Sequence, residues 1–204
     1  MIDKIRCENR YGSDIHPYLI ALLQHVQETT ADIPDNISKE EYYNVKNNID
    51  SDLFPDWYKG LVGFCASYSA VWFSSYAGEV RIKDSRLRNY TEEAIRNLKK
   101  QAPNLEGIVF DTCDFRKLNS HITNWVIYCD IPYRGTTEYK DGDFPYEEFY
   151  EWAKKMSKHN YVFISEYNMP DDFECIWSKE INCDIDYRQR LKRVEKLWRV
   201  KNGK

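Results

Sequence analysis

Short apolar runs in the second half of the chain constrain the fold most strongly. They are GIVFD (107–111), NWVIYCD (124–130) and YVFIS (161–165). Continuous apolar runs of this length are typical of strands that are buried on both faces. Between the last two runs, a helix is predicted to begin at Pro145. Its apolar face consists of Phe149, Trp152, Ala153 and Met156. A strand, a helix and a further strand in this order predict a parallel sheet covered by helices.

Other segments of the sequence predict helices. A helix is expected from Pro17, with Leu19, Ile20, Leu23 and Val26 on one face. Ser38 and Glu41 form a capping-box pattern, which opens a second helix through Lys46. Thr91 is expected to cap a third helix, which ends before Pro103.

Three segments carry weaker patterns. Residues 53–80 have no clean period, so loops and short helices are expected there, and ECIW (174–177) predicts a weak strand. The tail from Asp186 to Val200 fits either a helical stripe or a terminal strand over 194–200.

Length and composition narrow the class of protein. A chain of 204 residues predicts a single domain, 1–204. The net charge of −4 excludes a general polyanion binder, so any contact with nucleic acid requires local basic patches. The six cysteines are widely spaced without a CxxC pair, which favours neither a zinc site nor a disulfide framework. No signal peptide or membrane-length apolar run is evident, so a cytoplasmic protein without membrane contacts is expected.

The sequence Asp130-Ile131-Pro132-Tyr133 directly follows one of the predicted strands. In open α/β sheets, ligands bind beyond the carboxyl ends of the strands. A carboxylate and an adjacent main-chain carbonyl, held rigid by a proline, can accept the hydrogens of an exocyclic amine. A tyrosine two residues further on can stack on the ring that carries this amine. The alternative is a turn with an ordinary aspartate, since four residues are a weak pattern by themselves.

From about Gly12 onward, the chain resembles the Dam-type DNA adenine methyltransferases, particularly their bacterial and phage-borne branch. The catalytic motif of that family is Asp-Pro-Pro-Tyr, which residues 130–133 resemble. Further segments that resemble the family follow in its order: GSDIHPYLIALL, GFCASYSAVWFSSYAGE, RNY, FDTCDFRKL and FISEYNMPDDF. The resemblance covers nearly the whole chain.

The resemblance implies an α/β fold with a Rossmann-like methyltransferase sheet and covering helices. It also implies a small, mostly helical insertion at 38–90 that serves as the target-recognition region. The implied activity is methyl transfer from S-adenosylmethionine to the N6 amine of adenine in double-stranded DNA, without a metal and with the base flipped out of the stack. Asp130, Ile131, Pro132 and Tyr133 would be catalytic.

The resemblance further assigns cofactor contacts to Asp14, Ile15, Asp114, Phe115 and Asp130. In this assignment, Asp14 meets the ribose of the cofactor, while Asp114 and Phe115 border its adenine. From the residues alone, Asp14 fits a helix cap equally well, and Asp114 fits a turn.

The chain departs from the family pattern in two places. Ile131 replaces a proline, but isoleucine keeps the required main-chain carbonyl. The glycine-rich cofactor loop and the strand before it are expected just upstream of residues 1–10, and none of the eight glycines forms that loop. We therefore expect either an N-terminally truncated form that lacks its first strand, or a complementing polypeptide that carries the missing cofactor loop.

Candidate DNA contacts lie in two segments. For the first, a solvated face is the alternative, and the second would line the base pocket or form a lid. The residues are Arg81, Lys83, Arg86, Arg88 and Asn89 in the first segment, and Thr136, Thr137 and Tyr139 after the catalytic motif. Two further functions stay open: an inactive remnant that binds DNA or a partner subunit, and a methyltransferase of RNA or of a small amine.

Overall fold

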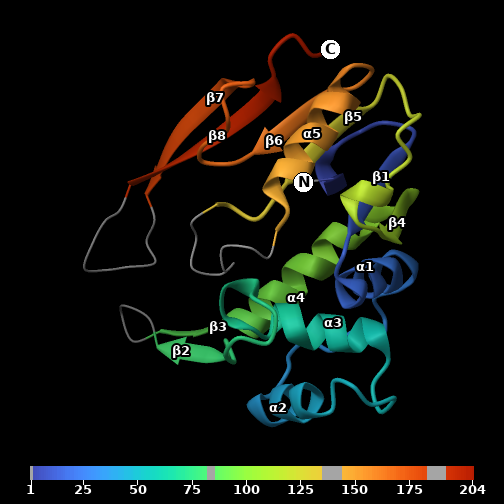
Figure 1. Ribbon diagram of the computed structural model, residues 1–204. Helices are drawn as coiled ribbons and strands as arrows, with labels where there is room; N and C mark the ends of the chain where they lie inside the picture. The colour runs from blue at the N-terminus through green and yellow to red at the C-terminus, as the bar shows by residue number, and fades with distance from the viewer. Residues whose placement is uncertain (1, 82–85, 135–143, 183–191) are drawn as a thin grey trace. The chain divides into compact units, whose positions relative to one another are not determined.

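The computed structural model describes residues 2–81, 86–134, 144–182 and 192–204. In these residues the chain is a mixed α/β protein with five α-helices and several small sheets (Figure 1). The chain divides into two compact units, Met1–Asp114 and Phe115–Lys204, and each is described by itself. The expected single domain therefore stays a prediction.

The first unit packs its helices around a short parallel sheet. Its elements are β1 (Arg10–Asp14), α1 (Pro17–Glu28), α2 (Lys39–Asn47), α3 (Asp56–Cys65), β2 (Glu79–Arg81), β3 (Leu87–Asn89), α4 (Tyr90–Gln101) and β4 (Ile108–Thr112). β1 pairs in parallel with β4, and β2 pairs antiparallel with β3. The core of this unit includes Ile20, Val26, Leu61, Ile95 and Ile108, which come from α1, α3, α4 and β4.

The second unit is built on a four-stranded sheet. Its elements are β5 (Val126–Asp130), α5 (Tyr146–Ser157), β6 (Tyr161–Ser165), β7 (Phe173–Asn182) and β8 (Lys192–Val200). The strand order is β5-β6-β8-β7, with β5 parallel to β6 and the other pairs antiparallel. Phe149, Ala153 and Met156 of α5 pack with Val162 and Ile164 of β6. The predicted strand, helix and parallel strand are therefore confirmed.

Several predicted helix boundaries are also confirmed. α1 begins at Pro17, and Ser38 caps α2 by accepting a 3.0 Å hydrogen bond from the backbone N–H of Glu41. The expected cap at Thr91 is wrong, because Asn89 occupies the N-cap position of α4. Residues 53–80 contain the ten-residue helix α3, in agreement with the short helices expected there.

The strands differ from expectation in length and burial. The expected full burial of the apolar runs is wrong: Val109 is 60% exposed and Val126 is 66% exposed. For residues 192–200 the open choice is settled in favour of a strand, β8, while the part of this tail over 186–191 lies outside the described residues. The weak strand near 174–177 is part of the longer β7. A Rossmann topology is not evident among the described strands, which form three separate sheets.

Candidate functional site

The candidate site in the second unit lies where β5 ends. β5 pairs in parallel with β6 so that Asp130 lies opposite Ser165, and both strands end at the same edge of the sheet. Asp130 remains accessible to solvent. Partial burial of the carboxyl group raises the pKa of Asp130 above its ordinary value, and the charge of Glu195 adds a smaller effect in the same direction. Asp130 is therefore a more basic carboxylate than an ordinary surface aspartate.

Two contacts fix the backbone directly after Asp130. The side chain of Ile131 is only 7% exposed and belongs to the core beneath α5. The phenol of Tyr146, at the start of α5, donates a 2.9 Å hydrogen bond to the carbonyl oxygen of Pro132. Ile131 is thus held by burial and Pro132 by a hydrogen bond. We call residues 130–133, which were predicted to be catalytic, the catalytic corner.

Tyr133 is held by side chains from β6 and β8. Its hydroxyl lies 2.9 Å from the Oγ of Ser165 and donates a 3.2 Å hydrogen bond to the Oε2 of Glu195. Its ring meets the ring of Tyr167 edge-on, with 4.6 Å between centroids. Burial, followed by the nearby carboxylates, raises the pKa of the Tyr133 phenol, which therefore stays protonated and able to donate.

Glu166 supports the backbone that follows the catalytic corner. Its side chain is 1% exposed. Its Oε2 accepts a 2.9 Å hydrogen bond from the backbone N–H of Arg134, and its Oε1 accepts one of 2.5 Å from the N–H of Tyr167. Burial raises the pKa of Glu166, although these backbone donors act in the opposite direction. One buried side chain thus ties the loop after β5 to the loop after β6.

Sequence reasoning did not assign a role to Ser165, Glu166 or Glu195. Ser165 and Glu166 had a usable signal, since they stand at the carboxyl end of a predicted strand, as Asp130 does. Glu195 had none, because its segment fitted a helix and a strand equally well.

The predicted cofactor residues of the first unit stand at one edge of its sheet. Asp14 ends β1 and Asp114 follows β4, and the backbone N–H of Cys113 donates a 3.0 Å hydrogen bond to the carbonyl oxygen of Asp14. The Oδ1 of Asp14 also accepts a 2.8 Å hydrogen bond from the N–H of His16, directly before α1. Asp14 therefore supports the helix start. Ile15 is 71% exposed.

Asp130 and Phe115, the other predicted cofactor residues, belong to the second unit. The ring of Phe115 is partly buried in an aromatic cluster. Its contacts are edge-on with Phe149 at 5.4 Å and with Trp152 at 5.6 Å, and tilted with Phe144 at 5.8 Å. These packing contacts hold the Phe115 ring in place without a ligand.

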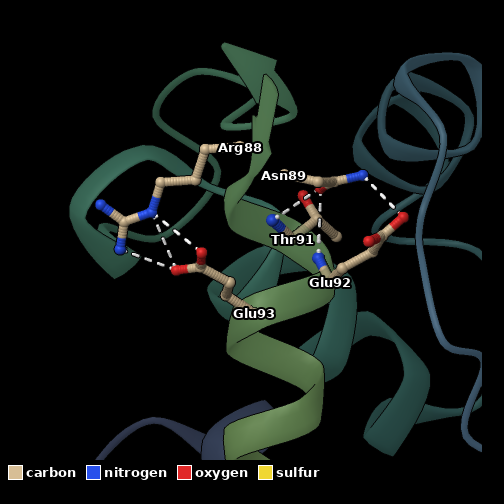
Figure 2. A network of polar contacts seen from close by, with 5 residues as sticks. All are labelled: Arg88, Asn89, Thr91, Glu92 and Glu93. Carbon is tan, nitrogen blue, oxygen red and sulfur yellow. Dashed lines mark hydrogen bonds and ion pairs between the residues drawn. The ribbon is translucent and has the colours of Figure 1, made fainter. Parts of the chain in front are cut away.

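The predicted DNA contacts in the first unit lie on and beside the β2–β3 pair. Arg81 and Arg86 are exposed there. Figure 2 shows that Arg88 forms a two-pronged ion pair with Glu93, whose shortest N–O distance is 2.7 Å. The guanidinium of Arg88 also lies 4.6 Å from the ring centroid of Tyr90. A DNA phosphate would have to compete with Glu93 for Arg88.

Asn89 has a structural role at the start of α4. Its side-chain oxygen accepts hydrogen bonds from the N–H groups of Thr91 at 3.1 Å and Glu92 at 3.2 Å (Figure 2). Its amide nitrogen donates to the Oε1 of Glu92 at 3.1 Å. These contacts identify Asn89 as a helix cap, which leaves its predicted contact with DNA as a prediction.

Four of the predicted DNA contacts lie outside the described residues: Lys83, Thr136, Thr137 and Tyr139. In the part of the chain that is described, no three His, Cys, Asp or Glu side chains gather in a way that could hold a metal ion. None of the described helices combines the length and the apolar character needed to cross a membrane.

No protein-family model matches the chain, and no curated protein matches it either. Any activity has to be inferred from the chemistry of the residues themselves.

Proposed function

We propose that the protein is a DNA adenine methyltransferase, which transfers a methyl group from S-adenosylmethionine to the N6 amine of a flipped adenine. The observation that carries the proposal is the catalytic corner. It joins a carboxylate of raised pKa, a main-chain turn fixed on two sides and a tyrosine ring held by two hydrogen bonds. Each of these parts matches a requirement of amine methylation.

The amine of adenine is a poor nucleophile, because its lone pair is delocalised into the ring. Asp130 accepts one amine hydrogen and takes up the proton that the nitrogen loses, and its raised pKa favours this transfer. The main-chain carbonyl of Ile131 is the second acceptor, and Tyr133 stacks on the base. Both groups belong to a rigid turn, so that the amine is oriented before it reacts.

S-adenosylmethionine, when bound, supplies a methyl group attached to a positively charged sulfur. Carboxylates at the carboxyl ends of parallel strands are chemically suited to it, since they accept hydrogen bonds from ribose hydroxyls and complement the positive charge. Asp14 and Asp114 of the first unit meet this requirement and would hold the cofactor. The Rossmann-like arrangement of the sheet belongs to the same proposal.

Double-stranded DNA is the proposed substrate, and Arg81 and Arg86 on the β2–β3 pair are suited to contact its phosphates. Because the net charge of the chain is −4, we expect DNA affinity to depend on such local patches and to fall steeply with salt. This segment lies within the proposed target-recognition region, residues 38–90.

The test is methyl transfer to adenine-containing duplex DNA from tritium-labelled S-adenosylmethionine. We expect incorporation with the wild type and a loss of at least about a hundredfold in Asp130→Asn, which cannot take up the proton. Asp172→Asn is the matched control, because Asp172 lies in the same unit and forms an ion pair with Lys154 at 3.1 Å. If wild type and Asp130→Asn incorporate equally little tritium, the enzymatic proposal is wrong. DNA binding without transfer would then favour the inactive remnant.

A further inference from the structure

Glu195 is a second carboxylate at the catalytic corner and comes from a different strand, β8. An ionised carboxylate can only accept hydrogen bonds, so the phenol of Tyr133 donates to Glu195. The phenol oxygen can then accept the hydrogen of Ser165, whose Oγ is 2.9 Å away. The hydrogen bonds thus form a chain in which Ser165 donates to Tyr133 and Tyr133 donates to Glu195.

This chain of hydrogen bonds fixes the position and the rotation of the Tyr133 ring. The hydroxyl is hydrogen-bonded to side chains of two strands, and the edge-on contact with Tyr167, in the loop after β6, restrains the ring. A ring that is immobilised in advance loses less conformational entropy when a base stacks on it. The arrangement is therefore suited to the capture of a planar ligand.

We propose that Glu195 is a positioning residue of the adenine site, where it accepts the phenol hydrogen of Tyr133 and, together with Ser165, fixes the ring on which the flipped base stacks. This inference rests on the proposed function and adds to it a residue that is 62 positions away from Tyr133 in the sequence.

The charge of Glu195 has a second consequence, for Asp130. Among the described residues near Asp130, the phenols of Tyr128 and Tyr133 and the thiol of Cys129 all have raised pKa values, that of Cys129 to about 12. These groups are uncharged at neutral pH. Burial is the largest cause of the raised pKa of Asp130, and the charge of Glu195 raises it further.

Two substitutions separate the hydrogen bond from the charge. Glu195→Gln keeps an acceptor for Tyr133 and removes the charge, whereas Glu195→Leu removes both. Glu174→Gln and Glu174→Leu are matched controls. Glu174 lies on β7 of the same sheet. Its Oε1 accepts a 2.6 Å hydrogen bond from the Nε of Arg199 on β8, which is not part of the catalytic corner. Ser165→Ala removes the other hydrogen-bond partner of Tyr133.

The first readout does not depend on activity. In protein with carbon-13 at the phenolic carbon of tyrosine, the Tyr133 resonance is identified by its loss in Tyr133→Phe. We expect Glu195→Leu and Ser165→Ala to shift this resonance and Glu174→Leu to leave it in place. An unshifted Tyr133 resonance in folded Glu195→Leu would overturn the proposal, even if the enzyme is inactive.

The second readout is the pH profile of methyl transfer. For Glu195→Leu we expect kcat to fall between about tenfold and a hundredfold, with little change in KM for DNA, because contacts to the DNA backbone supply most of the affinity. For Glu195→Gln we expect a kcat within about threefold of wild type and an acid limb at lower pH. Equal profiles of Glu195→Leu and Glu174→Leu would contradict the positioning role. If the wild type transfers no methyl group, the proposed function is wrong. The Tyr133 carbon-13 resonance still shows whether Glu195 holds the Tyr133 ring.

Discussion

Among single residues, Glu166 is expected to have a large effect on the stability of the second unit. It is 1% exposed, and its carboxylate satisfies the backbone N–H groups of Arg134 and Tyr167. Glu166→Ala would leave both donors without this acceptor. Since an unsatisfied buried donor costs about 1–3 kcal/mol, we expect the free energy of unfolding to fall by about 2–4 kcal/mol.

Chemical denaturation of Glu166→Ala measures this loss. Glu174→Ala is the control, because its ion pair with Arg199 is partly exposed and is expected to contribute less than about 1 kcal/mol. Equal losses in the two variants would show that Glu166 does not hold the catalytic corner in place.

Asp130 predicts a pH dependence of stability. Its pKa is raised in the folded state, so the folded protein binds this proton more tightly than the unfolded chain does. The resulting stabilisation is fully present below the ordinary pKa of aspartate, about 3.9, and is lost as the pH rises through the raised value. We therefore expect the free energy of unfolding of the wild type, relative to Asp130→Asn, to decline across this window. Parallel curves for the two proteins in denaturant titrations would contradict the expectation.

Among the elements, α3 was expected only as one of the short helices within residues 53–80, without its bounds. Five consecutive residues, from Lys59 to Gly63, are buried, so burial in this stretch is not confined to one face of the helix. α1 and α2 were predictable because Pro17 and the Ser38–Glu41 pair mark their starts. The apolar runs predicted β4 and β5 correctly as strands but not their exposure, since neither run indicates which neighbours will cover it.

The close packing of α3 against α1 makes a prediction at Gly60. A Cβ atom at this position would lie 2.1 Å from the backbone carbonyl oxygen of Tyr18 in α1. Because that atom belongs to a helix backbone, Gly60→Ala must push the two helices apart. We expect a loss of about 1–3 kcal/mol in the free energy of unfolding, measured by denaturant titration. A stability equal to that of the wild type would contradict the contact between α1 and α3.

Asn89 allows capping and DNA binding to be separated. Asn89→Ala removes the acceptor for the first turn of α4 and should lower the free energy of unfolding by about 1 kcal/mol. Asn89→Asp keeps the capping oxygen, but it replaces the amide that donates to Glu92 by a negative charge. If Asn89 also contacts a phosphate, folded Asn89→Asp will lose more affinity for duplex DNA than folded Asn89→Ala does, in titrations at the same fixed salt. Unchanged DNA affinity of Asn89→Asp would restrict Asn89 to its role in the helix.

For the molecule as a whole, local sequence patterns identified one part of the candidate site and missed another. The catalytic corner is contiguous in sequence and follows an apolar run, which suggested a site, but the resemblance to the Dam-type family was needed to predict it. Its partners are distant in sequence: Ser165 is 32 positions from Tyr133, and Glu195 is 62 positions from it. Only the pairing of β5, β6 and β8 brings them together, and a local pattern contains no information about that pairing.

The central claim is that Asp130 and Tyr133 direct methyl transfer to the N6 amine of adenine in DNA. The most direct measurement is mass spectrometry of nucleosides from duplex DNA that was incubated with the protein and S-adenosylmethionine. We expect N6-methyldeoxyadenosine with the wild type and with Asp172→Asn, and its loss with Asp130→Asn. A methyl group found on another base, or the same yield of N6-methyldeoxyadenosine from Asp130→Asn as from the wild type, would contradict it.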